Sequence, residues 1–250
     1  MRSKDIMFGY NNVEGMPHAY DKADLSEDYV KSILVPLNLQ KGSRILDLAC
    51  GRGYEAAAIK ELSGATVIES DLNSEAFYSN SNPDRKFVAA DIQALPFAEN
   101  SFDLVHIKDG LVHIDDKRSF FDKVYKILKP GGNLLLVTNC SRKIVEGRLG
   151  FFVISQGMDT SQLNFASLDE YSKLVEERTE YLKEKGVKNV EVSLPYFQTS
   201  KELIERIANN SGFEKVEGVI PDGWVPRDHE KNWGHFIRHV FLFKKKDKDL

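Results

Sequence analysis

The sequence predicts an α/β fold built on a doubly wound, mostly parallel β-sheet. Between residues 44 and 139, short apolar runs alternate with amphipathic stretches of helical length. This alternation is typical of βαβ units, whose parallel strands are buried on both faces of the sheet. Near the end of the chain, apolar runs at 214–220 and 235–245 are joined by about fifteen residues without a helical pattern, which is too short for a parallel crossover. We therefore expect the last two strands to be antiparallel neighbours.

The expected elements follow from their local patterns. An irregular arm at 8–23 precedes a helical stretch at 24–37, which Ser26 can start and Pro36 can end. Regular alternation begins after this helix. The expected strands are 44–49, 66–70, 86–90, 102–107 and 133–139, and the expected helices between them are 54–62, 74–80 and 117–128.

A Lys-Pro-Gly-Gly turn follows the last of these helices. Pro130 presets φ, and Gly131 or Gly132 supplies a positive φ, so the turn ends the helix and redirects the chain into the next strand.

Regularity lapses for about sixty residues after residue 139. Segment 140–167 is expected to be loop with short elements. A helix follows it, and a second helix at 200–213 leads into the two final strands. The apolar face of the first helix consists of Leu168, Tyr171, Leu174, Val175 and Leu182.

Composition favours a globular protein without a polyanionic partner. The chain has 250 residues, is 42% hydrophobic and carries a net charge of −4, which supplies no general field to attract nucleic acid or anionic lipid. Cys50 and Cys140 are too few for a disulfide framework. The first residues lack the apolar core of a secretory signal, and no apolar run could span a bilayer. We expect a cytoplasmic protein with a small-molecule substrate, no nucleic-acid partner and no membrane span; the oligomeric state stays open.

The stretch Gly-Arg-Gly-Tyr-Glu-Ala at 51–56 joins the first strand to a helix. Such a loop suits a nucleotide, because its backbone can approach the ligand and the helix start offers free N–H groups. Its spacing fits a dinucleotide fingerprint, with Asp71 twenty positions after Gly51. Asp47, just before the loop, would repel a pyrophosphate but suits S-adenosylmethionine (SAM), which carries a sulfonium and an ammonium group.

Four ordered segments carry a family resemblance. Asp-Leu-Ala-Cys-Gly-Arg-Gly at 47–53 resembles the first motif of the class I SAM-dependent methyltransferases, with Ala49 in place of its first glycine. Segments 67–77, 88–106 and 127–137 resemble later motifs of the same family in register, and the chain is most similar to its small-molecule, ubiquinone/menaquinone-biosynthesis-like type. The resemblance implies a Rossmann-like methyltransferase fold with a seven-stranded sheet, an antiparallel last strand and a lid insertion.

The resemblance also implies residue roles. Asp71 would bind the ribose hydroxyls, Leu72 the adenine, and Asp91 the adenine amino group, while Ile92 would pack on the ring. Capping is an alternative role for Asp47 and Asp71, and a plain turn is an alternative for Asp91. Cys50 is expected to be buried rather than nucleophilic. The full expected cofactor set is Tyr20, Asp47, Ala49, Cys50, Gly51, Gly53, Asp71, Leu72, Asp91, Ile92 and Lys108.

The expected acceptor side lies at the end of the fourth strand. His113 aligns with a histidine frequent in small-molecule relatives, and it is either a substrate contact or part of a helix start. His18 in the arm is the second catalytic candidate, and His106, inside the strand, is expected to be structural. The histidine spacings match no metal motif, so no metal is expected. Other candidate cavity residues are Phe151, Phe152, Trp224, Trp233 and His235.

The expected organisation is an arm and helix covering the site (1–40), a SAM-binding core (41–138), a substrate lid (139–198) and the rest of the core sheet (199–250). The function hypothesis is methyl transfer from SAM to an oxygen or nitrogen of a small, partly apolar molecule. Alternatives are an NAD-dependent oxidoreductase, a non-catalytic SAM-binding protein and an RNA methyltransferase. Tyr181 and Lys185 have the spacing of an oxidoreductase pair, but chance explains it better.

Overall fold

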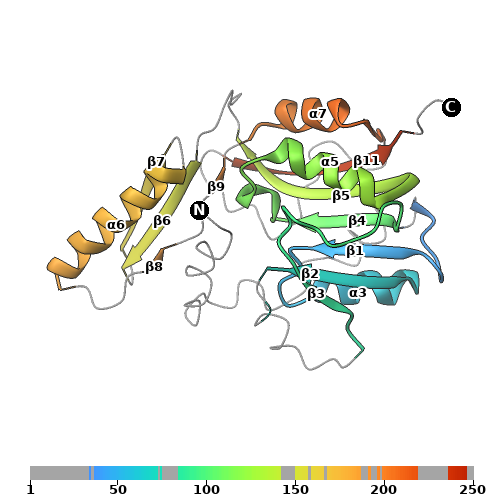
Figure 1. Ribbon diagram of the computed structural model, residues 1–250, viewed down its shortest axis with the longest axis horizontal. Coiled ribbons are helices and arrows are strands. Elements are labelled where there is room, and N and C mark those ends of the chain that lie inside the picture. Colours follow the sequence, from blue (N-terminus) through green and yellow to red (C-terminus); the bar gives the residue numbers. More distant parts are fainter. Residues whose placement is uncertain are drawn as a thin grey trace.

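A computed structural model of the chain describes residues 34, 37–72, 74, 84–141, 150–156, 159–165, 168–186, 191–192, 196–197, 199–218 and 236–246. Its centre is a seven-stranded sheet with the order β10-β11-β5-β4-β1-β2-β3 (Figure 1). The strands are β1 (Arg44–Leu48), β2 (Thr66–Asp71), β3 (Phe87–Ala89), β4 (Phe102–Lys108), β5 (Leu128–Ser141), β10 (Phe213–Lys215) and β11 (Phe236–Lys245). Strands β1 to β5 pair in parallel, whereas β11 runs antiparallel to both β5 and β10. The predicted sheet with an antiparallel last strand is therefore confirmed.

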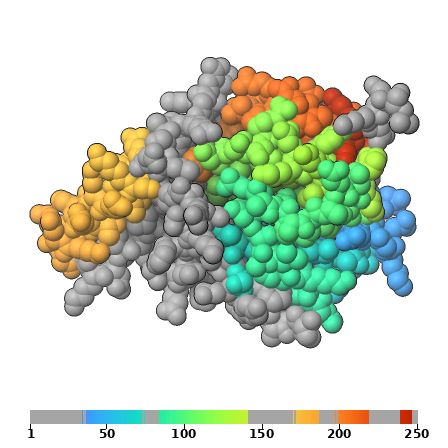
Figure 2. All heavy atoms as spheres, in the orientation of Figure 1, coloured from blue at the N-terminus to red at the C-terminus, as the bar shows by residue number. Residues whose placement is uncertain are grey.

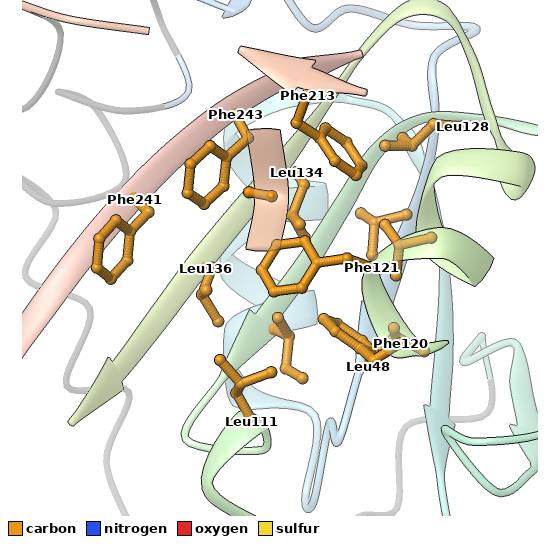
Figure 3. Packing of buried hydrophobic residues seen from close by; sticks show 14 of the residues in the cluster. Leu48, Leu111, Phe120, Phe121, Leu128, Leu134, Leu136, Phe213, Phe241 and Phe243 are labelled. Carbon is orange, nitrogen blue, oxygen red and sulfur yellow. The ribbon is translucent and has the colours of Figure 1, made fainter. Parts of the chain in front are cut away.

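One face of the sheet is covered by α5 (Lys117–Ile127) and α7 (Lys201–Asn210). The layer between them is rich in phenylalanine (Figure 3). Phe121 of α5 makes edge contacts with Phe213 and Phe243, each with ring centroids 6.0 Å apart. Aromatic pairs in this arrangement add stability beyond the area they bury, so this layer fixes the antiparallel end of the sheet to α5.

The opposite face is covered by α3 (Tyr54–Ser63). Ile59 of α3 packs there with Ile45 of β1 and Leu104 of β4, while Leu46 points into the phenylalanine-rich layer. Successive side chains of a strand point to opposite faces. Every second side chain of β1 and β4 therefore lies beneath α3.

Side-chain caps start two of the helices. Ser200 accepts the N–H of Leu203 at 3.2 Å at the start of α7. Asp116 accepts the N–H of Ser119 at 2.9 Å at the start of α5. Such caps satisfy N–H groups that have no partner within the helix, which explains why these helices begin where they do.

The Lys-Pro-Gly-Gly segment behaves partly as predicted. Helix α5 ends before it, and Gly131 has the positive φ of 69°. The segment is nevertheless part of β5, which begins at Leu128, earlier than expected. Leu128 pairs with Phe102 and Asn133 with Leu104, so the extra residues between them form a bulge in the ladder.

The expectation of a loop with short elements at 140–167 is wrong. Two antiparallel strands of seven residues each occupy half of it and form a second sheet with two short strands that come after the helix at 168–184. The sequence carried the signal: an aromatic and β-branched run at 151–154, then a two-residue connection containing Gly157, as in a tight hairpin. The elements are β6 (Gly150–Gln156), β7 (Asp159–Phe165), α6 (Leu168–Glu184), β8 (Glu191–Val192) and β9 (Tyr196–Phe197).

The predicted helix at 168–184 is confirmed, and Leu182 on its apolar face is 2% exposed. This helix lies at one end of the molecule, to the side of the seven-stranded sheet (Figures 1 and 2). Most of the expected helices at 24–37 and 74–80 lies outside the described residues. No helix in the described part of the chain is long and apolar enough to cross a membrane.

Candidate functional site

A row of titratable side chains crosses three strands beneath the start of α3. Leu104 of β4 belongs to the apolar layer under α3, and His106, two residues later, lies on the same face. The strand register places His106 beside Asp47 of β1, and Asp47 beside Glu69 of β2. Their exposed fractions are 0%, 2% and 4%. The carboxyl ends of β4, β1 and β2 thus bring together residues that are far apart in sequence.

Asp47 and His106 form a buried pair. Nδ1 of His106 lies 2.7 Å from Oδ1 of Asp47. Oδ2 of Asp47 and Nε2 of His106 have no hydrogen-bond partner among the described residues. Burial raises the pKa of Asp47, as do the charges of Glu55 and Glu69, while His106 lowers it. The pair therefore leaves one buried carboxylate oxygen available to a further donor.

Glu69 is neutralised from the other side of the row. Nε of Arg85 lies 3.0 Å from both carboxylate oxygens of Glu69. Gly53, at the start of α3, has a φ of 77°, and a Cβ there would overlap this ion pair. The end of the glycine loop at Gly53 therefore packs directly against the Glu69–Arg85 ion pair.

Glu55 and Lys108 form a third ion pair beside the loop. Nζ of Lys108 lies 2.6 Å from Oε1 of Glu55, and the two side chains are 11% and 20% exposed. Burial alone would raise the pKa of Glu55, but the ammonium of Lys108 outweighs it and holds that pKa below its usual value. The ammonium of Lys108 is thus engaged by Glu55, and its contact with a cofactor stays a prediction.

The glycine loop bends through alternate left-handed residues. Ala49, Gly51 and Gly53 have φ values of 53°, 50° and 77°. The N–H of Gly51 donates to Oδ2 of Asp71 at 2.9 Å, and a Cβ on Gly51 would meet no atom of the described residues within 4 Å. Leu72, directly after β2, is 36% exposed. The backbone of Gly51 and the side chain of Leu72 are therefore accessible in the described part of the chain, and the carboxylate of Asp71 lies between them.

Three further residues of the expected cofactor set have clear surroundings. Cys50 is buried, and burial raises the pKa of its thiol far above the usual range, which disfavours the thiolate that a nucleophile needs. Asp91 accepts the N–H of Gln93 at 2.8 Å, which is the plain turn given as its alternative role. Ile92 packs partly buried against the phenylalanine-rich layer. An adenine contact from Asp91 or Ile92 stays a prediction.

The acceptor side is described only in part. His113 is the last residue of a short 3₁₀ helix, η4 (Leu111–His113), that follows β4, and it is half-buried. The backbones of Phe151 and Phe152 lie in β6, but their side chains lie outside the described residues. So do the remaining candidates His18, Tyr20, Trp224, Trp233 and His235.

Sequence reasoning missed Lys117. It lies at the start of α5 in a polar stretch that looks solvated, yet it is 6% exposed. Its Nζ donates to the carbonyl oxygen of Ile114 at 2.8 Å and to that of Phe197 at 3.4 Å. The residue therefore ties the segment after η4 to β9 of the second sheet, and no local pattern in the sequence marks that long-range contact.

The oxidoreductase alternative has little support in the site. Tyr181 is 46% exposed on α6, and its ring is covered by the guanidinium of Arg178 at 4.8 Å and the ammonium of Lys185 at 5.6 Å. These are the surroundings of a surface tyrosine. A carboxylate at Asp47, buried just before the loop, would also repel a pyrophosphate.

Comparisons with known sequences find proteins that are similar to the centre of the chain. Residues 46–136 match a sequence family described as a methyltransferase domain. A ubiquinone/menaquinone biosynthesis C-methyltransferase of Klebsiella pneumoniae is 36% identical over 118 residues, which are 43% of this chain and 47% of that one. The chain thus spans about half the length of such relatives. A phosphoethanolamine N-methyltransferase of Plasmodium falciparum is 26% identical over 232 residues, 82% of both chains.

Solved structures share the fold. A SAM-dependent methyltransferase from Mesorhizobium loti matches with a TM-score of 0.55 and 19% identity, covering 88% of this chain and 99% of that one. A Burkholderia thailandensis 1,6-didemethyltoxoflavin-N1-methyltransferase matches with a TM-score of 0.58 and 16% identity, covering 98% and 87%. At these identities the likeness shows the fold alone.

Proposed function

We propose that the chain is a class I SAM-dependent methyltransferase, as the match of residues 46–136 to a methyltransferase domain indicates, and that it transfers a methyl group from SAM to a nitrogen or oxygen of a small, partly apolar molecule. The proposal assigns the reaction to the cytoplasm. It gives residues 1–40 and 139–198 the role of covering the site.

One observation carries the cofactor assignment: the buried Oδ2 of Asp47, which has no donor among the described residues. A buried carboxylate oxygen without a partner is unfavourable, so its natural complement is a cationic donor. The ammonium group of SAM is such a donor. The open space at Gly51, the carboxylate of Asp71 and the exposed Leu72 suit the rest of a nucleoside.

SAM bound there would supply a methyl group on a positively charged sulfur: an acceptor lone pair would bond to the methyl carbon in line as the sulfur–methyl bond breaks, and the sulfur would leave as a neutral thioether. The residues around it hold reactants rather than exchange bonds with them, and such positioning contributes about 7 to 11 kcal/mol in model reactions. Asp47 binds the ammonium and Asp71 the ribose hydroxyls. His113 accepts the proton that a neutral N–H or O–H acceptor must lose.

The lengths of the sequence matches favour nitrogen as the acceptor. The C-methyltransferase relative matches only 43% of this chain, about as much as the methyltransferase domain at 46–136. The phosphoethanolamine N-methyltransferase matches over 82%. That match reaches beyond the cofactor-binding region, where methyltransferases differ by acceptor. A small amine is therefore the first acceptor to test.

The test begins with binding. Thermal denaturation should show stabilisation by SAM and by its demethylated product S-adenosylhomocysteine (SAH) but not by NAD; stabilisation by NAD alone would refute the proposal. The protein is then incubated with methyl-labelled SAM and phosphoethanolamine, sarcosine, a hydroquinone or bulk RNA. Label in an amine supports the proposal. Label only in the hydroquinone carbon or in RNA contradicts it, and binding without transfer to any acceptor indicates a non-catalytic SAM-binding protein.

A further inference from the structure

We propose that His106 is a positioning residue for the cofactor: it holds the carboxylate of Asp47 so that its second oxygen is available to the ammonium group of SAM. This inference rests on the proposed function and assigns a role to a residue that sequence reasoning treated as structural. It concerns recognition of the amino-acid end of the cofactor, separately from its nucleoside.

The geometry supplies the first step. His106 and Asp47 are direct neighbours in the parallel β1–β4 ladder, and Nδ1 lies 2.7 Å from Oδ1. Both residues are at most 2% exposed. Because sheet register and close packing restrict both side chains, the contact fixes the orientation of the carboxylate plane. Oδ2 cannot swing away to find another donor.

The surrounding charges supply the second step. Asp47 has acidic neighbours on two elements: Glu69 beside it on β2 and Glu55 on α3, both of which raise its pKa. Like charges directly opposite in a sheet are destabilising. Glu69 is already paired with Arg85, and Glu55 with Lys108.

Each of these acids therefore has its own cation, and His106 is the donor that serves Asp47. Burial and the two other acids raise the pKa of Asp47, and His106 lowers it. A carboxylate is a better partner for an ammonium group than a protonated carboxyl group is. His106 thus orients the carboxyl group of Asp47 and favours its ionised form.

The third step concerns the hydrogen-bond acceptor that the pair leaves unsatisfied. In the described part of the site, the Asp47–His106 pair has a carboxylate oxygen that is buried and lacks a donor. A purely structural pair would be expected to satisfy both oxygens, because leaving a buried acceptor unsatisfied is unfavourable. An incoming cationic group would complete it.

The test compares two ligands that share a nucleoside. SAH carries the amino-acid end, and 5′-methylthioadenosine lacks it. Their affinities are measured by titration calorimetry for the wild type, His106→Phe, His106→Val and His106→Asn. Phenylalanine and valine lack a donor, and valine is well tolerated in strands, so it serves if the larger side chain prevents folding. Asparagine keeps an N–H donor near the place of Nδ1. His239→Phe, a matched change on β11, is the control.

His106→Phe and His106→Val should lose about 10- to 100-fold in SAH affinity, as for the loss of a charged hydrogen bond, with 5′-methylthioadenosine affinity nearly unchanged. His106→Asn should recover most of the SAH affinity, and His239→Phe should bind both ligands like the wild type. Equal losses for both ligands would make His106 structural and overturn the inference. So would unchanged SAH affinity in the valine variant. Failure of the wild type to bind SAH would instead overturn the proposed function, and the inference with it.

Discussion

Ala49 and Gly110 compete for the same space between the ends of β1 and β4. A Cβ on Gly110 would lie 2.7 Å from the Cβ of Ala49, far inside van der Waals contact. Ala49 stands where the first motif has a glycine, and it keeps the left-handed φ of 53° that favours glycine. The absence of a side chain at Gly110 therefore accommodates the extra methyl group at Ala49.

This relationship predicts non-additive stabilities. Ala49→Gly should stabilise the protein slightly or leave it unchanged, because relief of left-handed strain of about 1 kcal/mol offsets the loss of the methyl group. Gly110→Ala should destabilise by about 1 to 3 kcal/mol through overpacking, and the double variant should recover part of this loss. Urea denaturation of the four proteins measures the coupling. Strictly additive effects would show that the two positions do not share space.

Substitution of the two loop glycines should have different effects on stability and on cofactor binding. Gly53→Ala places a Cβ into the Glu69–Arg85 pair at a φ of 77°, so we expect destabilisation above about 3 kcal/mol. The Cβ of Gly51→Ala would meet no atom within 4 Å in the described part of the chain, so this change should cost only about 1 to 2 kcal/mol of stability. It should nevertheless weaken SAH binding strongly, because the loop backbone could no longer approach the ligand. Equal losses of stability with intact binding in Gly51→Ala would contradict a cofactor loop.

His113 carries the third prediction. If it accepts the acceptor's proton, His113→Asn should lower kcat by about 10²- to 10⁴-fold while SAH affinity stays within about twofold. The measurement is labelled methyl transfer at saturating SAM, with His239→Asn as the matched control on β11. A kcat that is unchanged at every pH would remove His113 from the chemistry and leave it a residue of η4.

Sequence patterns were sufficient for the parts of the fold that local physics determines. Alternating periodicities predicted the parallel sheet, and the short last connection predicted its antiparallel end. The hairpin β6–β7 was missed, although Gly157 marked it, because the run before it contains no polar alternation. Isolated apolar runs do not distinguish a strand from loop segments without knowledge of their partner.

The site shows a sharper limit. Asp47 was predictable from its place before a glycine loop, but its partner His106 lies 59 positions away. Their contact depends on the β1–β4 register, which no local pattern specifies. The same holds for Lys117 and Phe197, 80 positions apart. Ion pairs that join different strands emerge only once the chain is folded.

Lys117 carries a prediction about pH. Burial lowers its pKa from the usual 10.5 to about 8, against the opposing charge of Asp115. Between these two values the unfolded chain binds more protons than the folded one, so stability should rise with pH through this window. The shift corresponds to a gain of about 3 kcal/mol in the free energy of unfolding from pH 8 to pH 10.5. As the pH falls back below 8, the folded protein loses this gain. The charged ammonium of Lys117, which contacts two backbone carbonyls and the ring of Phe197, thus opposes folding at neutral pH because its burial costs more than the charge of Asp115 returns.

Urea denaturation between pH 7 and pH 10.5 tests this prediction on Lys117→Met, which keeps the length of the side chain but cannot ionise. The stability of the wild type relative to this variant should rise by about 3 kcal/mol across the window. Lys129→Met is the control, because that lysine is 38% exposed and pairs with Asp103 at the surface; its difference from the wild type should lack this rise. Parallel curves for Lys117→Met and the wild type would show that the charged ammonium reaches water, so that β9 does not cover it in solution.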